Sequence, residues 1–371
     1  MKDGVTVGLL APDVLGRAPM LAAATSRFRR TLPARLTATA NVRPDFDQRV
    51  AVVLNRNAAQ VGDRLVADVS RMVPRGDLFV TRTLDEAEAA AHQVIERRYG
   101  TVLLGGGDGT VTWGLTTLLR LAKQSGIAVP RFGVLPCGTG NSMAFALDAH
   151  DPMAVIARAA EHGVTRPVEL LTVEGKLAPF AGCGLDAQIL DDYSRTSNGL
   201  SRLGLGFIPA GLGRYSIAVA TRSIPRYMAR QLPEVIAVNA GAPAFRIGED
   251  GRPAGEPIAA GDVLWRGRCA LASCATIPYY GFGLKMFPFA GQQRHRFQLR
   301  MSDAPTTAIL ANLGGLFAGT WRDVEHIHDF YCERVTIYLE KEGAFQVGGD
   351  LLGPRKSVTV GLAPTAVDFV G

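Results

Sequence analysis

The sequence predicts a parallel α/β domain followed by an antiparallel β-sandwich domain. Apolar runs alternate with amphipathic segments across residues 49–165, and short strands separated by turn residues fill residues 166–371. The chain has 371 residues, 47% of them hydrophobic, which is more than one ordinary core accommodates. We therefore expect domains at 49–165 and 166–371 after an N-terminal extension at 1–48, with the final strands free to return to the first domain.

The first domain is expected to start at Arg49 and to alternate strands with helices. In chain order the segments are strand RVAVVLN, helix AAQVGDRLVADVSRMV, strand DLFVTR, helix LDEAEAAAHQVIERR, strand TVLLGGG, helix WGLTTLLRLAKQSG and strand RFGVLP. This order implies a parallel sheet. Open parallel sheets bind their ligands at the carboxyl ends of the strands.

Two glycine-rich loops follow apolar strands of this domain. The first, GGGDGT, precedes a helix, and the second is LPCGTGNS at Leu135 to Ser142. Glycines let backbone amides converge on an anion, and a helix start offers unpaired N–H groups to phosphate. Neither loop matches G-x-x-x-x-G-K-[ST] or G-x-G-x-x-G. A tight strand-to-helix turn is the alternative for one loop alone, but two adjacent loops predict a polyphosphate site.

The second half of the chain predicts an antiparallel sandwich. Its strands are expected in the segments RPVELLTVEGKLAPFAGCGLDAQI, PEVIAVNAG, GRCALASCATIPYYGFG, RHRFQLRMS, RVTIYLEKEGAFQVGGD and SVTVGLAPTAVDFV. Two further segments, SNGLSRLGLGFIPAGLGRY and IPYYGFGLKMFPFAG, are apolar, aromatic and rich in glycine. They suit either an acyl-chain cleft or the core and turns of a sandwich.

The composition restricts the class of protein but does not identify the reaction or the ligand. Lys and Arg exceed Asp and Glu by 40 to 34, and the formal charge of +6 is compatible with anionic ligands, nucleic acid or an acidic membrane surface. Five cysteines without a CxxC pair indicate neither a zinc knuckle nor a complete disulfide framework. Pro12 cuts the first apolar run too early for a signal peptide, and LGLGFIPAGLG is shorter than the ~20 residues that span a bilayer. We expect a cytoplasmic protein whose membrane contact, if any, is peripheral.

The two loops together resemble the diacylglycerol kinase catalytic family, which includes bacterial diacylglycerol kinases and sphingosine and ceramide kinases. The family's GGDGT stands here as Gly106, Gly107, Asp108, Gly109 and Thr110, and its LPxGTGND as LPCGTGNS, with serine in place of the final aspartate. The resemblance runs from about residue 49 to the C-terminus. It implies a Rossmann-like nucleotide domain of the NAD kinase and diacylglycerol kinase type, with ATP as phosphoryl donor and Mg²⁺ bound with the nucleotide.

The resemblance also implies the residues that contact the nucleotide. Asn55 stands at an asparagine of the family, although Arg56 replaces its neighbouring proline, and Thr83 matches a threonine near the nucleotide. Asp186 falls at an acidic position of the family. The implied nucleotide-binding set is Asn55, Thr83, Gly106, Gly107, Asp108, Gly109, Thr110, Gly138, Thr139 and Asn141.

Two carboxylates are the implied catalytic residues. The segment FQVGGDLLG resembles the family's Asp-Gly-Glu turn, which places Gly348 at its aspartate and Asp350 at its glutamate, the general base. A hairpin turn is the alternative role for Asp350. Asp108 is expected to bind Mg²⁺, directly or through water, or to position the acceptor, with a cap on the following helix as the alternative.

No protein-bound structural metal is expected. Bacterial relatives carry an aspartate for such an ion where this chain has Arg294 in FPFAGQQRHRFQLR, and a guanidinium cannot ligate a cation. His326 and His328 in EHIHD would lie on one side of a strand without a third ligand.

The function implied is an ATP-dependent lipid kinase. It would transfer the γ-phosphoryl of ATP to a hydroxyl of a diacylglycerol-like or sphingoid-like lipid at the inner membrane face. The expected partners are ATP and this lipid, not nucleic acid, and a homodimer stays open. A non-catalytic relative that binds nucleotide or lipid is the first alternative, because Ser142, Gly348 and Arg294 depart from the family pattern. An NAD kinase, which shares the GGDGT loop, is the second.

Overall fold

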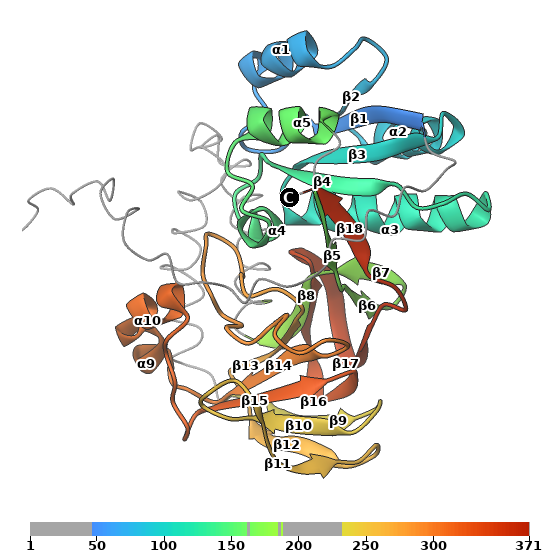
Figure 1. Cartoon of the computed structure of the whole chain (residues 1–371). Coiled ribbons are helices and arrows are strands. Elements are labelled where there is room, and N and C mark those ends of the chain that lie inside the picture. The colour runs from blue at the N-terminus through green and yellow to red at the C-terminus, as the bar shows by residue number, and fades with distance from the viewer. Residues whose placement is uncertain (1–46, 162–163, 185–186, 188–231, 371) are drawn as a thin grey trace, which may run out of the picture. The chain divides into compact units, whose positions relative to one another are not determined.

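The computed structural model describes residues 47–161, 164–184, 187 and 232–370 (Figure 1). The described residues all belong to one compact unit, Arg43–Gly371. Residues 1–46 of the expected N-terminal extension, the acidic position Asp186 and the apolar segment at 197–215 lie outside the described residues, and β1 begins two residues before the expected domain boundary. Among the helices described, none is both long and apolar enough to cross a lipid bilayer.

The first sheet has six strands in the order β2-β1-β3-β4-β18-β5. The strands are β1 (Asp47–Asn55), β2 (Leu78–Thr81), β3 (Tyr99–Gly106), β4 (Arg131–Pro136), β5 (Thr165–Val168) and β18 (Val367–Val370). Strands β1 to β4 pair in parallel, and β18 joins β4 in parallel and β5 in antiparallel orientation. Figure 1 shows β18 in red beside β4, so the end of the chain completes the sheet with which the described part begins.

Helices connect these strands, and the first three of them lie where the sequence predicts helices. They are α1 (Asp63–Met72), α2 (Leu84–Glu96), α3 (Asp108–Gln124), α4 (Ser142–Ala146) and α5 (Pro152–Ala160). Side chains of α2, α3 and α5 at helical spacing are buried in one cluster with those of the parallel strands. The carboxyl ends of β3 and β4, which are neighbours with Gly106 opposite Pro136, thus bring the two glycine-rich loops to the same edge.

The second sheet contains twelve strands, all paired in antiparallel orientation. They are β6 (Leu171–Val173), β7 (Lys176–Ala178), β8 (Phe180–Gly184), β9 (Glu234–Asn239), β10 (Ala244–Ile247), β11 (Pro253–Ile258), β12 (Val263–Arg268), β13 (Leu271–Ala275), β14 (Phe297–Ser302), β15 (Ile327–Cys332), β16 (Arg334–Val347) and β17 (Asp350–Leu362). Two short helices, α9 (Thr306–Ala311) and α10 (Leu313–Ala318), precede β15.

The long strand β16 organises this sheet. It pairs with β17 along one edge, while its other edge pairs first with β9, around Ile337, and then with β8, around Gln346. The sheet branches there, and apolar side chains of both branches share one buried cluster. The predicted fold class, a parallel α/β sheet followed by an antiparallel β domain, is confirmed.

Candidate functional site

The first glycine-rich loop ends β3 and starts α3. Gly107 is the N-cap of α3 with an extended backbone, φ −90° and ψ −177°. The N–H of Val111 donates to the Gly107 carbonyl at 3.1 Å, which is the first bond of the helix. The amides of Asp108, Gly109 and Thr110 precede that bond and have no acceptor within the helix. Three consecutive N–H groups are thus available at the carboxyl end of β3.

The second loop closes on itself through Asn141. This residue has φ 55°, a left-handed conformation that asparagine tolerates. Its Oδ1 accepts a hydrogen bond from the Gly138 N–H at 2.9 Å, and its Nδ2 donates to the Gly138 carbonyl at 2.9 Å. Gln60, from the loop after β1, donates to the same carbonyl at 3.2 Å. Thr139 lies half-buried at the tip of the loop.

The two loops touch through glycine backbone. A Cβ atom added to Gly138 would overlap the Cα of Gly107, and one added to Gly107 would lie 3.6 Å from the Gly138 Cα. Only glycine permits this approach at Gly138. The contact brings the second loop directly against the first, beside the amides at the start of α3.

Asp108 joins the loops by hydrogen bonds. Its Oδ1 accepts from the Ser142 N–H at 2.8 Å, and its Oδ2 accepts from the Ser142 hydroxyl at 3.2 Å. The surrounding protein shields the carboxyl from water and raises its pKa to about 6, while hydrogen bonds from Ser142 oppose this rise. Asp108 is the first residue of α3 and does not cap that helix, so the cap alternative is wrong. Its carboxylate instead meets the start of α4.

The bond network continues into the antiparallel domain. The Ser142 hydroxyl accepts a hydrogen bond from the Gly281 N–H at 2.6 Å, and the Gly140 carbonyl accepts one from the Phe282 N–H at 2.8 Å. The segment IPYYGFGLKMFPFAG, one of the two cleft candidates, is therefore attached to the second loop. Serine at position 142 makes this connection in place of the family's aspartate.

The remaining predicted nucleotide residues separate into two groups. Asn55, at the end of β1, donates from Nδ2 to the Thr110 hydroxyl at 3.0 Å and so contacts the first loop. Thr110 also packs on Gly106, where any Cβ would overlap its side chain. Thr83 follows β2, one strand beyond β1, and its hydroxyl caps α2 by accepting from the Glu86 N–H at 3.2 Å. The structure brings Asn55 to the loops and gives Thr83 a capping role.

The hairpin between β16 and β17 reaches the first loop. Gly348 and Gly349 have φ of 57° and 86°, and the Gly349 N–H donates to Gln346 Oε1 at 3.0 Å. The Asp350 carboxylate packs so closely on Gly109 that a Cβ there would overlap it. Desolvation raises the pKa of Asp350 although its side chain remains exposed, and the nearby positive charge of Lys176 opposes the rise. A carboxylate distant in sequence thus faces the amides at the start of α3.

Several residues of this arrangement carry no signal in the sequence. Gln60 and Gly281 hold the second loop from distant segments, and only the chain's path brings them there. Arg294 is exposed in the turn before β14. Of the two histidines expected on one strand face, His328 lies within β15, whereas His326 precedes it and hydrogen-bonds Asp303 at 2.9 Å. The described residues include no group of three or more His, Cys, Asp or Glu placed to hold a metal ion.

Comparisons with known proteins agree with this arrangement. Residues 49–173 match the model of the diacylglycerol kinase catalytic domain. A candidate diacylglycerol kinase from Bacillus anthracis str. Sterne has a similar structure, with a TM-score of 0.61, 17% identity and coverage of 87% of this chain and 96% of that one. A diacylglycerol kinase structure from the same organism gives a TM-score of 0.58 and 15% identity over 87% and 96% of the two chains.

At these identities the structural similarities establish the fold, and no curated protein sequence matches the chain. The matched segment contains both glycine-rich loops, Asn55 and the residues that join them. Residues 49–173 therefore match the diacylglycerol kinase catalytic domain, the family that the motifs of both glycine-rich loops resemble.

Proposed function

We propose that the protein is an ATP-dependent lipid kinase that transfers the γ-phosphoryl of ATP to a hydroxyl of a diacylglycerol-like or sphingoid-like lipid. The observation that carries the proposal is the meeting of three segments: two glycine loops in backbone contact, and a hairpin carboxylate packed on the first of them. Phosphoryl transfer depends mainly on positioning and on charge stabilisation, and this arrangement offers both.

The loops suit the phosphates of ATP. The start of α3 offers unpaired N–H groups and the positive end of a helix dipole, both of which favour negative charge. The approach of Gly107 to Gly138 keeps side chains out of the region between the loops. Asn55 and Gln60 fix the loops from the β1 side and are proposed to position them for the nucleotide.

The carboxylates suit a Mg²⁺ ion that accompanies the nucleotide. Mg²⁺ is commonly bound by one or two carboxylates together with substrate phosphates, so a cluster of protein ligands is not required. Asp108 is the first residue of α3, and Asp350 packs on Gly109 beside it. Asp108 is the residue proposed to hold the ion, through water because both its oxygens already accept from Ser142. When bound, the ion would neutralise charge on the phosphates.

Asp350 is proposed as the general base that accepts the proton of the acceptor hydroxyl. Its carboxylate is exposed to an incoming substrate yet packed on the phosphate-binding loop. The upward shift of its pKa makes the ionised carboxylate a better proton acceptor. Because only the ionised form accepts a proton, activity should rise with pH as Asp350 ionises.

Transfer of label from γ-labelled ATP tests the proposal. Diacylglycerol, sphingosine, ceramide and NAD are offered separately, and we expect labelled lipid with one of the first three. Label on NAD alone would contradict a lipid acceptor, and ATP binding without transfer to any acceptor would contradict catalysis.

A glycine variant ties this transfer to the loops. In Gly138→Ala the new methyl would overlap Gly107, so both ATP affinity and transfer should fall. Gly62→Ala is the matched control because a Cβ there meets nothing within 4 Å. Equal ATP affinity in the two folded variants would contradict the proposed phosphate site.

A further inference from the structure

We propose that α10 and the adjoining pocket form a surface that docks on an anionic phospholipid bilayer. We call it the α10 surface and define it by Leu313, Phe317, Lys285 and Arg322. The pocket takes a lipid phosphate between the two cations, and the two apolar side chains enter the bilayer interface. This inference rests on the proposed function for its biological purpose, since a lipid kinase must reach a lipid in a membrane.

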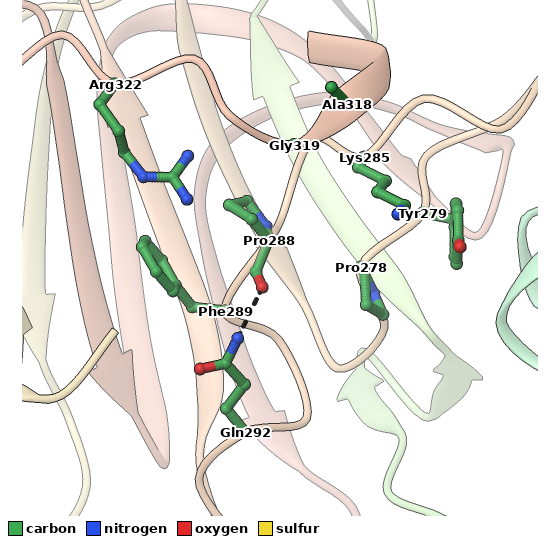
Figure 2. A pocket seen from close by; sticks show the side chains of 9 residues that line it. All are labelled: Pro278, Tyr279, Lys285, Pro288, Phe289, Gln292, Ala318, Gly319 and Arg322. Carbon is green, nitrogen blue, oxygen red and sulfur yellow. Dashed lines mark hydrogen bonds between the residues drawn. The ribbon is translucent and has the colours of Figure 1, made fainter. Parts of the chain in front are cut away.

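The pocket is small and carries positive charge. It has a volume of about 280 Å³ and lies between the segment at 278–292 and the turn at 318–322. Figure 2 shows Arg322 and Lys285 on opposite sides of Pro288. None of the nine residues that line the pocket is acidic. An anion is therefore the ligand that matches its charge.

Neither cation is neutralised within the part of the chain that the structure describes. Arg322 lies 4.6 Å over the Phe289 ring and donates to the Trp321 carbonyl at 3.0 Å, and Lys285 Nζ lies 5.6 Å from the Tyr279 ring centroid. The acidic residue that acts on Arg322, Asp329, is held by Arg300 through two hydrogen bonds of 2.8 and 2.7 Å. Desolvation and the Arg300 charge lower the pKa of Arg322, and both therefore disfavour its charged form. A bound anion would offset both effects because an opposite charge stabilises the guanidinium.

Exposed apolar side chains stand next to these cations. Leu313 and Phe317 are 43% and 49% exposed and lie four residues apart, on one face of α10. The Lys285 N–H donates to the Leu316 carbonyl at 3.1 Å, and Gly319 ends the helix with φ 69°. The helix and the pocket therefore form one continuous surface.

This combination favours a bilayer over a soluble ligand. A dissolved phosphate compound would account for the two cations but leaves the exposed side chains of α10 unexplained. Interfacial membrane binding uses both features, because apolar groups enter the headgroup boundary and cations contact lipid phosphates. Val324 is also exposed, but Asp323 and Glu325 flank it, so it is not part of this surface.

Vesicle sedimentation of the full chain, without nucleotide, tests the inference. The vesicles contain phosphatidylcholine alone or with phosphatidylglycerol, and the variants are Arg322→Gln, Lys285→Gln and Phe317→Ser. Arg64→Gln removes an exposed charge from α1, and Tyr338→Ser removes an aromatic ring that is 46% exposed on β16. These two variants are matched controls for charge and for exposed apolar area.

We expect wild type and both controls to bind the phosphatidylglycerol vesicles more tightly than phosphatidylcholine. Each lost charge should weaken that binding by roughly fivefold, and Phe317→Ser should weaken it by about tenfold. Equal binding by α10-surface variants and controls would overturn the inference. Binding to phosphatidylcholine vesicles alone would also overturn it, as would binding of soluble glycerol 3-phosphate without any binding of vesicles.

Kinase activity on a short-chain diacylglycerol dispersed without vesicles separates this inference from the proposed function. Arg322→Gln and Phe317→Ser should retain that activity, because these residues lie at the pocket and on α10 rather than in the glycine loops or the Asp350 hairpin. If wild type binds vesicles through this surface but transfers no phosphate, the proposed function fails and the docking surface stands. If it phosphorylates the dispersed lipid and α10-surface variants still bind vesicles as wild type does, the docking surface fails alone.

Discussion

Asp108 is a shielded carboxylate that no ion pair balances among the residues described. Its oxygens accept hydrogen bonds from Ser142, yet shielding from water still raises its pKa to about 6. Because the pKa of Asp108 is higher in the folded protein than in the unfolded chain, the protonated carboxyl favours folding. This contribution is fully present below pH 3.8, the unfolded pKa, and is lost as pH rises through about 6, the folded pKa. The native structure thus holds a negative charge at neutral pH at a cost in stability, as expected of a residue kept for binding.

The substitution Asp108→Asn should therefore change the free energy of unfolding more favourably at pH 7.5 than at pH 4.5. At ~1.4 kcal/mol per pKa unit, the change in free energy of unfolding between the two pH values should amount to no more than about 3 kcal/mol. Urea unfolding at both pH values measures it, with Asp262→Asn, an exposed aspartate, as control. A difference between wild type and Asp108→Asn that does not vary with pH would show that the carboxyl titrates normally.

At the scale of elements, the hairpin that carries Asp350 depends on its glycines. Gly348 has φ 57°, and a Cβ there would overlap the hydroxyl of Thr112 on α3. The family's aspartate is therefore not accommodated at this position with the present backbone. The hairpin of this chain reaches α3 because Gly348 allows the contact.

Gly348→Asp should destabilise the protein, by about 1 kcal/mol or more for the left-handed conformation and a further ~1 to 3 kcal/mol for the overlap. Gly175→Asp is the control, because Gly175 also has positive φ, at 81°, but a Cβ there meets nothing within 4 Å. Thermal or urea unfolding compares the two variants. Equal losses of stability would mean that the contact with Thr112 imposes no constraint.

The elements that the sequence predicted well are those with strong local patterns. The strand-loop-helix unit at Gly106 follows from an apolar run, a glycine cluster and a helical repeat, and the strand-loop unit at Gly138 follows from an apolar run and a glycine cluster. Helices α4, α5, α9 and α10 and strand β15 were not predicted. Helices α4, α9 and α10 have only five or six residues each, and Gly314 and Gly315 interrupt the apolar pattern of α10. The connections through Gln60 and Gly281 could not be predicted either, since they depend on the tertiary path.

At the scale of the whole molecule, the chain leaves the α/β sheet after β5, builds the antiparallel sheet and returns through β18. Phe369 of β18 is fully buried and lies beside Phe132 of β4, with ring centroids 6.1 Å apart. The end of the chain thus supplies core to the domain that holds the glycine loops. Stability of the phosphate site should depend on residues more than 200 positions away in sequence.

Phe369→Ala should lower the free energy of unfolding by about 3 to 5 kcal/mol, as expected for loss of a buried aromatic side chain. The same substitution at Phe317, which is 49% exposed, should cost far less. Urea unfolding followed by circular dichroism gives both values. Comparable stability of the two variants would argue that β18 adds little to the core of the first sheet.

Asp350 is proposed to accept the proton of a lipid hydroxyl beside a phosphate site built from the two glycine loops. The measurement that tests it most directly compares kcat for lipid phosphorylation and Kd for ATP in wild type, Asp350→Asn and Asp350→Glu. We expect Asp350→Asn to lose about 10² to 10⁴ in kcat, with Kd for ATP nearly unchanged, and Asp350→Glu to equal or exceed wild type. If Asp350→Asn phosphorylates lipid at the wild-type rate, the Asp350 carboxylate is not the general base.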